Sequence, residues 1–187
     1  GKPSCGKCAV RSDPRLLILA TGGLVLVCNV LPVNLVEYDR SAIIQGEWWR
    51  LLSGQFCHWS ALHLFSNLAA LAGVTIIAGR GIRRWLALLP LAAPLLSAFL
   101  LIAAPALEHY RGLSGLVALL VIGTAVEGGV IGRVLGLAYL GKLVFDATTA
   151  NPSALLPEGI VTAWQAHLGG ILLGLVAAFG FRCQAQV

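Results

Sequence analysis

Six apolar runs divide the chain, and they constrain its fold more than any other feature of the sequence. They cover residues 16–31, 61–78, 85–104, 113–126, 130–145 and 163–181. A helix needs about 20 apolar residues to cross the hydrocarbon core of a bilayer. Apolar residues make up 58% of the chain and charged residues only 11%, with a mean hydropathy of +0.85. The runs therefore predict an all-α, polytopic membrane protein with six transmembrane helices in one domain, residues 16–182, preceded by a tail of residues 1–15.

The positions of the basic residues predict the orientation of these helices. If both termini lie inside, nine basic residues fall on inner segments (Lys2, Lys7, Arg11, Arg15, Arg80, Arg83, Arg84, Arg133 and Arg182) and four on outer ones (Arg40, Arg50, Arg111 and Lys142). Because inner loops of membrane proteins are enriched in lysine and arginine, we expect cytoplasmic termini. The net charge of +5 then reflects orientation in a lipid bilayer rather than nucleic-acid binding.

The shortest apolar run falls well short of the thickness of a bilayer. At 1.5 Å per residue, the run 113–126 covers about 21 Å, whereas the hydrocarbon core is about 30 Å thick. Its start must lie below the outer surface, and residues 105–112 must dip into the membrane to reach it. Such a dip is tolerated only where the backbone is buried in protein or borders a wet cavity. Ser114 lies at this point.

Four polar residues interrupt the apolar runs and are candidates for a catalytic site, because hydrocarbon penalises buried polar groups. Ser114 lies between Gly112 and Gly115, and the free N–H groups at a helix start can stabilise an oxyanion. The alternative is a helix-capping serine in a small-residue packing motif. His167 is expected to share a helix face with Gly170 and Gly174, where it serves either as a proton acceptor or as a structural hydrogen-bonding residue.

Two further histidines and an asparagine precede the serine. His63 and Asn67 are four residues apart and share a helix face, so both can donate hydrogen bonds to a developing negative oxygen. His58 is expected at the outer entrance or in a water-exposed loop. Glu127 is expected at the inner end and Asp146 in an outer loop, which leaves no carboxylate to orient His167. The sequence therefore favours a serine and histidine dyad over a triad.

Metal and cofactor sites are not expected. The sequence has no H-E-x-x-H motif, and a transport or metal site built on His58, His63 and His167 is the weaker alternative. Cys5 and Cys8 form a C-x-x-C pair in the tail without a second pair at zinc-ribbon spacing, which favours an incidental or tail-specific role.

Taken in order, these residues resemble the rhomboid family of intramembrane serine proteases. The resemblance rests on Trp49-Arg50, then His58, His63 and Asn67, then Gly112-Leu113-Ser114-Gly115, then Ala166-His167 with Gly170 and Gly174. It implies a six-helix rhomboid-like bundle with Ser114 as nucleophile and His167 as general base and acid. It also implies an oxyanion site formed by His63, Asn67 and the Ser114 N–H beside Gly112 and Gly115.

The resemblance assigns two more roles and shows one departure. Gly170 and Gly174 become the residues that pack the sixth helix against the fourth. Many bacterial rhomboids carry a tyrosine one turn after the serine that packs on the histidine, whereas this chain has Ala118.

Local phrases look most like the rhombosortase branch of that family. They are Tyr38-Asp39-Arg40, Gly46-Glu47-Trp48-Trp49-Arg50-Leu51-Leu52 and Tyr110-Arg111-Gly112-Leu113-Ser114-Gly115. The branch implies a bacterial protease that cleaves membrane-anchored proteins whose carboxyl-terminal tails combine a Gly-Gly motif, an apolar helix and a basic cluster. We expect the protein in the inner membrane, with a site that opens to the periplasmic face, because Ser114 begins the short apolar run and the basic residues hold the opposite ends inside. Two alternatives stay open: a general rhomboid acting on other single-span proteins, and a non-catalytic rhomboid-like protein that binds membrane helices.

Overall fold

A computed structural model describes residues 13–127, 129–149, 156–157, 160 and 162–185. The long helices are α1 (Pro14–Val30), α5 (Ala61–Ala78), α7 (Leu89–Ala103), α8 (Ser114–Glu127), α9 (Val130–Thr149) and α10 (Trp164–Ala185). Short elements join them: α2 (Val33–Val36), α3 (Arg40–Ile44), α4 (Arg50–Ser53), the 3-10 turn η1 (Gly79–Gly81) and α6 (Ile82–Leu86). Residues 1–12, which include Cys5 and Cys8 and most of the predicted tail, lie outside the described residues.

Each apolar run corresponds to one long helix, but several boundaries differ from the predictions, and α10 continues past residue 181 to Ala185. The run 85–104 begins in α6 and continues in α7, which has a proline in its first turn. Proline suits a helix start because its missing N–H would have no partner there. The fifth helix was expected to end at residue 145, whereas α9 continues to Thr149. Asp146 therefore lies in a helix rather than in the predicted outer loop.

A small antiparallel pair of strands was not expected from the sequence. β1 (Tyr38–Asp39) pairs with β2 (His109–Tyr110), so that Tyr38 faces Tyr110 and Asp39 faces His109. The Asp39 side chain then caps α3 by accepting a hydrogen bond from the Ala42 N–H. The pair fastens the segment before α4 to the loop that leads into Ser114, so the described residues form a helical fold with one short sheet.

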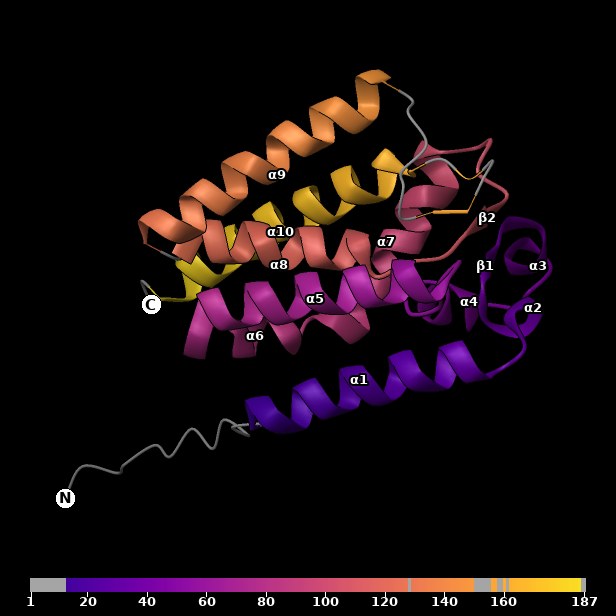
Figure 1. Cartoon of the computed structure of the whole chain (residues 1–187), viewed down its shortest axis with the longest axis horizontal. Coiled ribbons are helices and arrows are strands. Elements are labelled where there is room, and N and C mark those ends of the chain that lie inside the picture. The colour runs from indigo at the N-terminus through magenta and orange to yellow at the C-terminus, as the bar shows by residue number, and fades with distance from the viewer. Residues whose placement is uncertain (1–12, 128, 150–155, 158–159, 161, 186–187) are drawn as a thin grey trace.

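α8 is the central helix of the bundle. It packs against α10, α9, α5, α6 and α7, and its residues from Gly115 to Thr124 are all buried. α1 and α9 lie on opposite sides of this core (Figure 1). The first turn of α1 and the last turn of α10 lie at one end of the molecule, whereas α2, α3 and the two strands lie at the other (Figure 1).

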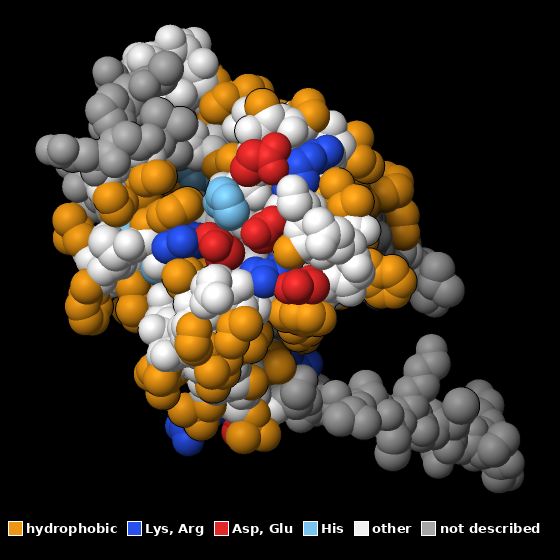
Figure 2. Space-filling model, turned by 90° about the vertical axis from the view of Figure 1, so that its right-hand side faces the viewer, with side chains coloured by type: hydrophobic (Ala, Val, Ile, Leu, Met, Phe, Trp, Pro, Cys, Tyr) orange, Lys and Arg blue, Asp and Glu red, His pale blue; other side chains and the backbone are white. Residues whose placement is uncertain are grey.

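The surface of the bundle is apolar along its sides and polar at one end. Large side chains such as Phe65, Ile76, Ile102 and Val176 are exposed on the helices. At the end that carries the two strands, acidic, basic and histidine side chains gather inside a rim of hydrophobic ones (Figure 2). Two stretches, Ala61–Leu86 and Trp164–Cys183, are long and apolar enough to cross a membrane, while α1, α7 and α8 are apolar but shorter. An exposed apolar surface of this kind points to a membrane protein.

Candidate active site

Gly112 sets the position of Ser114 at the start of α8. Its backbone has a φ of 146°, a left-handed region that favours glycine. A Cβ there would lie 2.9 Å from His63 Cε1 and 3.8 Å from Ser114 Oγ, so the glycine lets both side chains approach the loop. The Tyr110 hydroxyl donates a hydrogen bond to the Gly112 carbonyl at 2.8 Å. Burial raises the pKa of Tyr110 to about 12, which keeps this donor protonated.

Glycines also bring α8 and α10 into backbone contact. A Cβ on Gly170 would lie 1.9 Å from the Gly115 carbonyl oxygen, and one on Gly115 would lie 2.8 Å from the Ala166 carbonyl oxygen. One turn further along α10, a Cβ on Gly174 would lie 3.1 Å from the Leu119 carbonyl oxygen. The residues beside Ser114 and beside His167 therefore touch, and only glycine permits this distance.

A cavity of about 420 Å³ opens next to this contact. All four polar residues that were expected to act together line it: Ser114, His167, His63 and Asn67. The side chains of the last three are buried within the bundle. The structure thus brings a hydroxyl, two imidazoles and an amide to one cavity among apolar helices.

His58 lies elsewhere than expected. It is neither water-exposed nor among the described residues that line the cavity; it is 8% exposed and packs edge-on against His63, with ring centroids 5.1 Å apart. Burial, with a smaller contribution from His63, lowers the pKa of His58 to about 4. His58 is therefore a neutral packing partner of His63 at physiological pH.

The hydrogen bonds of α5 orient the expected oxyanion donors. Asn67 Nδ2 donates to the His63 carbonyl oxygen at 3.0 Å, and Ser66 Oγ donates to the same oxygen at 2.8 Å. A primary amide has two N–H groups, so one donor of Asn67 stays available. His63 Nδ1 is buried without a hydrogen-bond partner in the described part of the chain.

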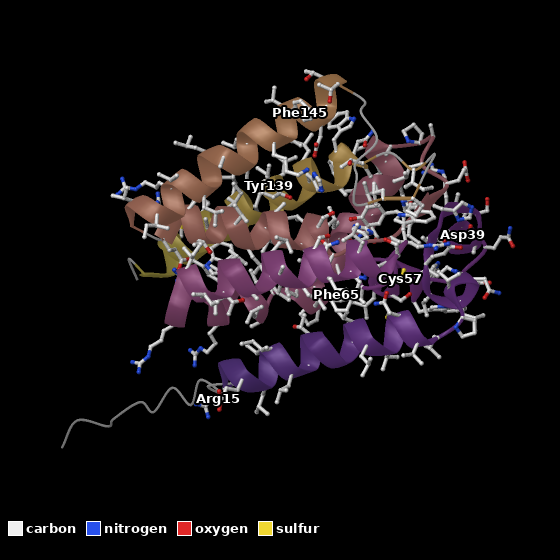
Figure 3. All side chains as sticks on the ribbon, viewed as in Figure 1. Arg15, Asp39, Cys57, Phe65, Tyr139 and Phe145 are labelled. Carbon is white, nitrogen blue, oxygen red and sulfur yellow. The ribbon has the colours of Figure 1, made fainter. Side chains whose placement is uncertain are left out.

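α9 contributes three side chains that sequence reasoning missed. Tyr139, on the side of α9 that faces the bundle (Figure 3), packs its ring edge-on against His167 with centroids 5.9 Å apart. Asp146 Oδ2 lies 3.4 Å from His167 Nδ1 and is also paired with Lys142. The prediction that no carboxylate lies near His167 was wrong, because α9 extends past residue 145. The three side chains are spaced by three and four residues, the spacing of a single helix face, which is the signal that was available in the sequence.

Glu127 lies at the opposite end, as expected. It accepts a hydrogen bond from Trp85 Nε1 at 2.6 Å and pairs with Arg84 at 2.5 Å. It therefore joins α8 to α6 and takes no part in the cavity.

An ion pair borders the cavity at the polar end of the molecule. Arg111 stacks over the Trp59 ring at 4.0 Å from its centroid and pairs with Glu37 at 2.8 Å. Both Arg111 and Trp59 line the cavity, as does His109 of β2. The charged end face in Figure 2 therefore adjoins the cavity.

Comparison with known proteins shows the family. The sequence profile described as "Rhomboid domain" matches residues 45–184, which includes Ser114, His167, His63 and Asn67. A search of curated proteins found no match. Because the profile covers well over half of the chain, this protein belongs to the rhomboid family, whose members are intramembrane serine proteases.

Proposed function

We propose that this protein is an intramembrane serine endopeptidase in which Ser114 is the nucleophile and His167 the general base. The observation that carries the proposal is the backbone contact between Gly115 of α8 and Gly170 of α10. Through this contact, Ser114 and His167 both line one cavity. A free serine is a weak nucleophile, and an adjacent neutral imidazole activates it. The family supplies a protease activity that suits this arrangement.

The reaction follows from these groups. Ser114 Oγ attacks the scissile carbonyl while its proton passes to His167. The Ser114 N–H, His63 and the free N–H of Asn67 donate to the oxyanion that forms. As the peptide C–N bond breaks, His167 gives its proton to the departing amine. Water then attacks the acyl-enzyme by the same route and restores the Ser114 hydroxyl.

The proposal includes an arrangement in the membrane. The exposed apolar sides of the helices suit six spans within lipid, with α8 held in the interior. Arg15 lies at the end opposite Asp39 (Figure 3), and Arg83 and Arg84 follow α5 in α6. These basic residues support cytoplasmic termini and a site that opens to the periplasmic face of a bacterial inner membrane.

We propose membrane-anchored proteins with a Gly-Gly motif near a carboxyl-terminal apolar helix as substrates. The support is the likeness of the phrases around Tyr38, Trp49 and Ser114 to the rhombosortase branch. A substrate helix must unwind to reach Ser114, and glycine makes unwinding easy because it weakens a helix by about 1 kcal/mol relative to alanine.

Cleavage by the purified protein tests both parts of the proposal. The protein is mixed in detergent with a Gly-Gly-tailed substrate, and both fragments are identified by mass spectrometry. The matched substrate has Leu-Leu in place of Gly-Gly. We expect cleavage of the first substrate only, and none by the Ser114→Ala variant. Equal cleavage of both substrates would favour a general rhomboid. If neither substrate were cleaved, the result would favour a protein that binds membrane helices without catalysis.

The membrane arrangement has its own test. Cys28, Cys57 and the other three cysteines are replaced, a single cysteine is placed at position 114, and a membrane-impermeant thiol reagent is applied from each side. The proposal predicts labelling from the periplasmic side. Labelling from the cytoplasm alone would invert the orientation.

A further inference from the structure

We infer that Asp146 of α9 is a positioning residue for His167, so that the site is a serine, histidine and aspartate arrangement assembled from three helices. This inference rests on the proposed protease function. It departs from the two-residue site that the sequence predicts, and it assigns to α9 a part in the chemistry.

The geometry joins the two side chains. His167 is 4% exposed, and its Nδ1 is buried without a hydrogen-bond partner among the described residues. Burying a polar nitrogen without a partner is unfavourable, because the nitrogen loses its hydrogen bond to water. Asp146 Oδ2 lies 3.4 Å from that nitrogen, and the carboxylate side chain is only 12% exposed. A small rotation of either side chain would turn this contact into a hydrogen bond, since catalytic contacts are often long before substrate binds.

The rest of α9 supports this arrangement. Lys142, one turn earlier on α9, pairs with the same oxygen, Asp146 Oδ2. Tyr139, one turn before Lys142, packs on the His167 ring and donates a hydrogen bond from its hydroxyl to the Ser114 carbonyl oxygen at 3.3 Å. One face of α9 therefore touches both the base and the backbone of the nucleophile.

The packing of α8 explains why the support for His167 comes from α9. A Cβ on Gly170 would lie 3.0 Å from Ala118 Cβ, so a tyrosine at position 118 has no room beside α10. Ala118 is completely buried in this contact. The aromatic ring that borders His167 comes from Tyr139 instead.

The inferred role of the Asp146 carboxylate is to stabilise and orient the His167 imidazole during proton transfer. When His167 takes the Ser114 proton on Nε2, the imidazolium carries its second N–H on Nδ1, facing Asp146. The carboxylate stabilises that positive charge and fixes the tautomer whose Nε2 can accept the proton, without being protonated itself. Without the carboxylate, the ring can rotate or place its single proton on the wrong nitrogen.

A merely structural role for Asp146 makes a different prediction. If the carboxylate serves only its i, i+4 pair with Lys142, removing either partner should have the same effect, because the same ion pair is lost. If it holds His167, Asp146→Asn should reduce activity far more than Lys142→Gln. Comparison of Asp146→Asn with Lys142→Gln therefore distinguishes a positioning role of Asp146 from a purely structural one.

The test measures kcat, KM and the rate of Ser114 labelling by a fluorophosphonate in the purified full chain. We expect Asp146→Asn to lower kcat by at least about 100-fold, within the roughly 10⁴-fold limit known for such changes in serine-protease triads. KM and the thermal unfolding temperature should stay near those of wild type, and labelling should slow in parallel with kcat. Glu108→Gln removes an exposed carboxylate of the strand end and is the matched control, with no expected loss.

Asp146→Glu keeps a carboxylate one methylene longer and should recover part of the lost kcat. If Asp146→Asn also lowers the unfolding temperature, Asp146→Glu becomes the decisive variant. Recovery of the unfolding temperature by Asp146→Glu without any recovery of kcat would overturn the inference. A kcat within about threefold of wild type in Asp146→Asn, or an equal loss in Lys142→Gln, would overturn it too. Failure of the wild-type chain to cleave or to be labelled would instead refute the proposed function.

Discussion

The two helices that flank α8 at the site are attached to it in different ways. α10 touches α8 backbone to backbone, since Gly170 and Gly115 leave no space for a Cβ. Among the described glycines of α9, Gly132 near the start of the helix makes such an approach to the backbone, since a Cβ there would lie 2.6 Å from the Thr124 carbonyl oxygen. Its half nearest the site meets the core through the longer side chains of Tyr139 and Asp146.

This difference separates two tasks. The contact of α8 with α10 fixes the positions of Ser114 and His167, the proposed nucleophile and base, because helix backbones in contact cannot shift without clashes. The contact of α9 decides how the His167 ring is oriented, through side chains that can rotate. Damage to the first contact should therefore destroy the fold with the activity, whereas damage to the second should reduce activity in a folded protein.

The largest effect is expected at Gly170. Gly170→Ala places a methyl group 1.9 Å from the Gly115 carbonyl oxygen, so α8 and α10 must separate. We expect loss of cleavage and destabilisation by about 3 kcal/mol or more, seen as a lower unfolding temperature in detergent. Gly141→Ala on α9 is the control, since nothing lies within 4 Å of its Cβ position. Unchanged stability of Gly170→Ala would mean that the helices are not in backbone contact.

The next effect concerns the proposed oxyanion donors, Asn67 and His63. Asn67→Ala should reduce kcat on the order of 100-fold, with little change in KM, because such a donor acts mainly in the transition state. Ser66→Ala is the matched variant: both residues donate to the His63 carbonyl oxygen. Equal losses of kcat in Asn67→Ala and Ser66→Ala would mean that Asn67 only stabilises the helix. His63→Ala should resemble Asn67→Ala in kinetic assays.

A smaller effect is expected at Tyr139. Tyr139→Phe removes the hydrogen bond to the Ser114 carbonyl oxygen, worth about 1 kcal/mol, but keeps the ring beside His167. We expect a loss of kcat of about fivefold, and a larger loss for Tyr139→Ala, which removes both contacts. Equal activity of Tyr139→Ala and wild type would show that α9 does not hold the base.

The smallest effect lies away from both contacts, at His58. Its pKa falls from 6.5 to about 4 on folding, so the unfolded chain takes up a proton first as the pH drops. Stability should therefore decline between about pH 6.5 and 4 by at most about 3 kcal/mol from this group. His58→Gln should flatten this part of the pH profile of thermal unfolding. An unchanged profile would place the acid sensitivity in another group.

The sequence predicts the site better where chemistry and spacing coincide. Ser114, His63, Asn67 and His167 interrupt apolar runs, and the structure places all four around one cavity. Asp146 was missed because it directly follows an apolar run, where the helix was expected to end. In the structure α9 continues through Asp146, which pairs with Lys142 one turn earlier. The β1 and β2 strands were missed because two-residue strands have no periodic signal and depend on contact across the chain.

The most direct test of the central claim is labelling of Ser114 by a fluorophosphonate in the folded, purified protein. A single adduct on Ser114, located by mass spectrometry, should appear in wild type and be absent from Ser114→Ala. It should be strongly slowed in His167→Ala, because the nucleophile and its base act as a unit. A wild-type rate equal to that of His167→Ala, or an adduct on another serine, would contradict the account.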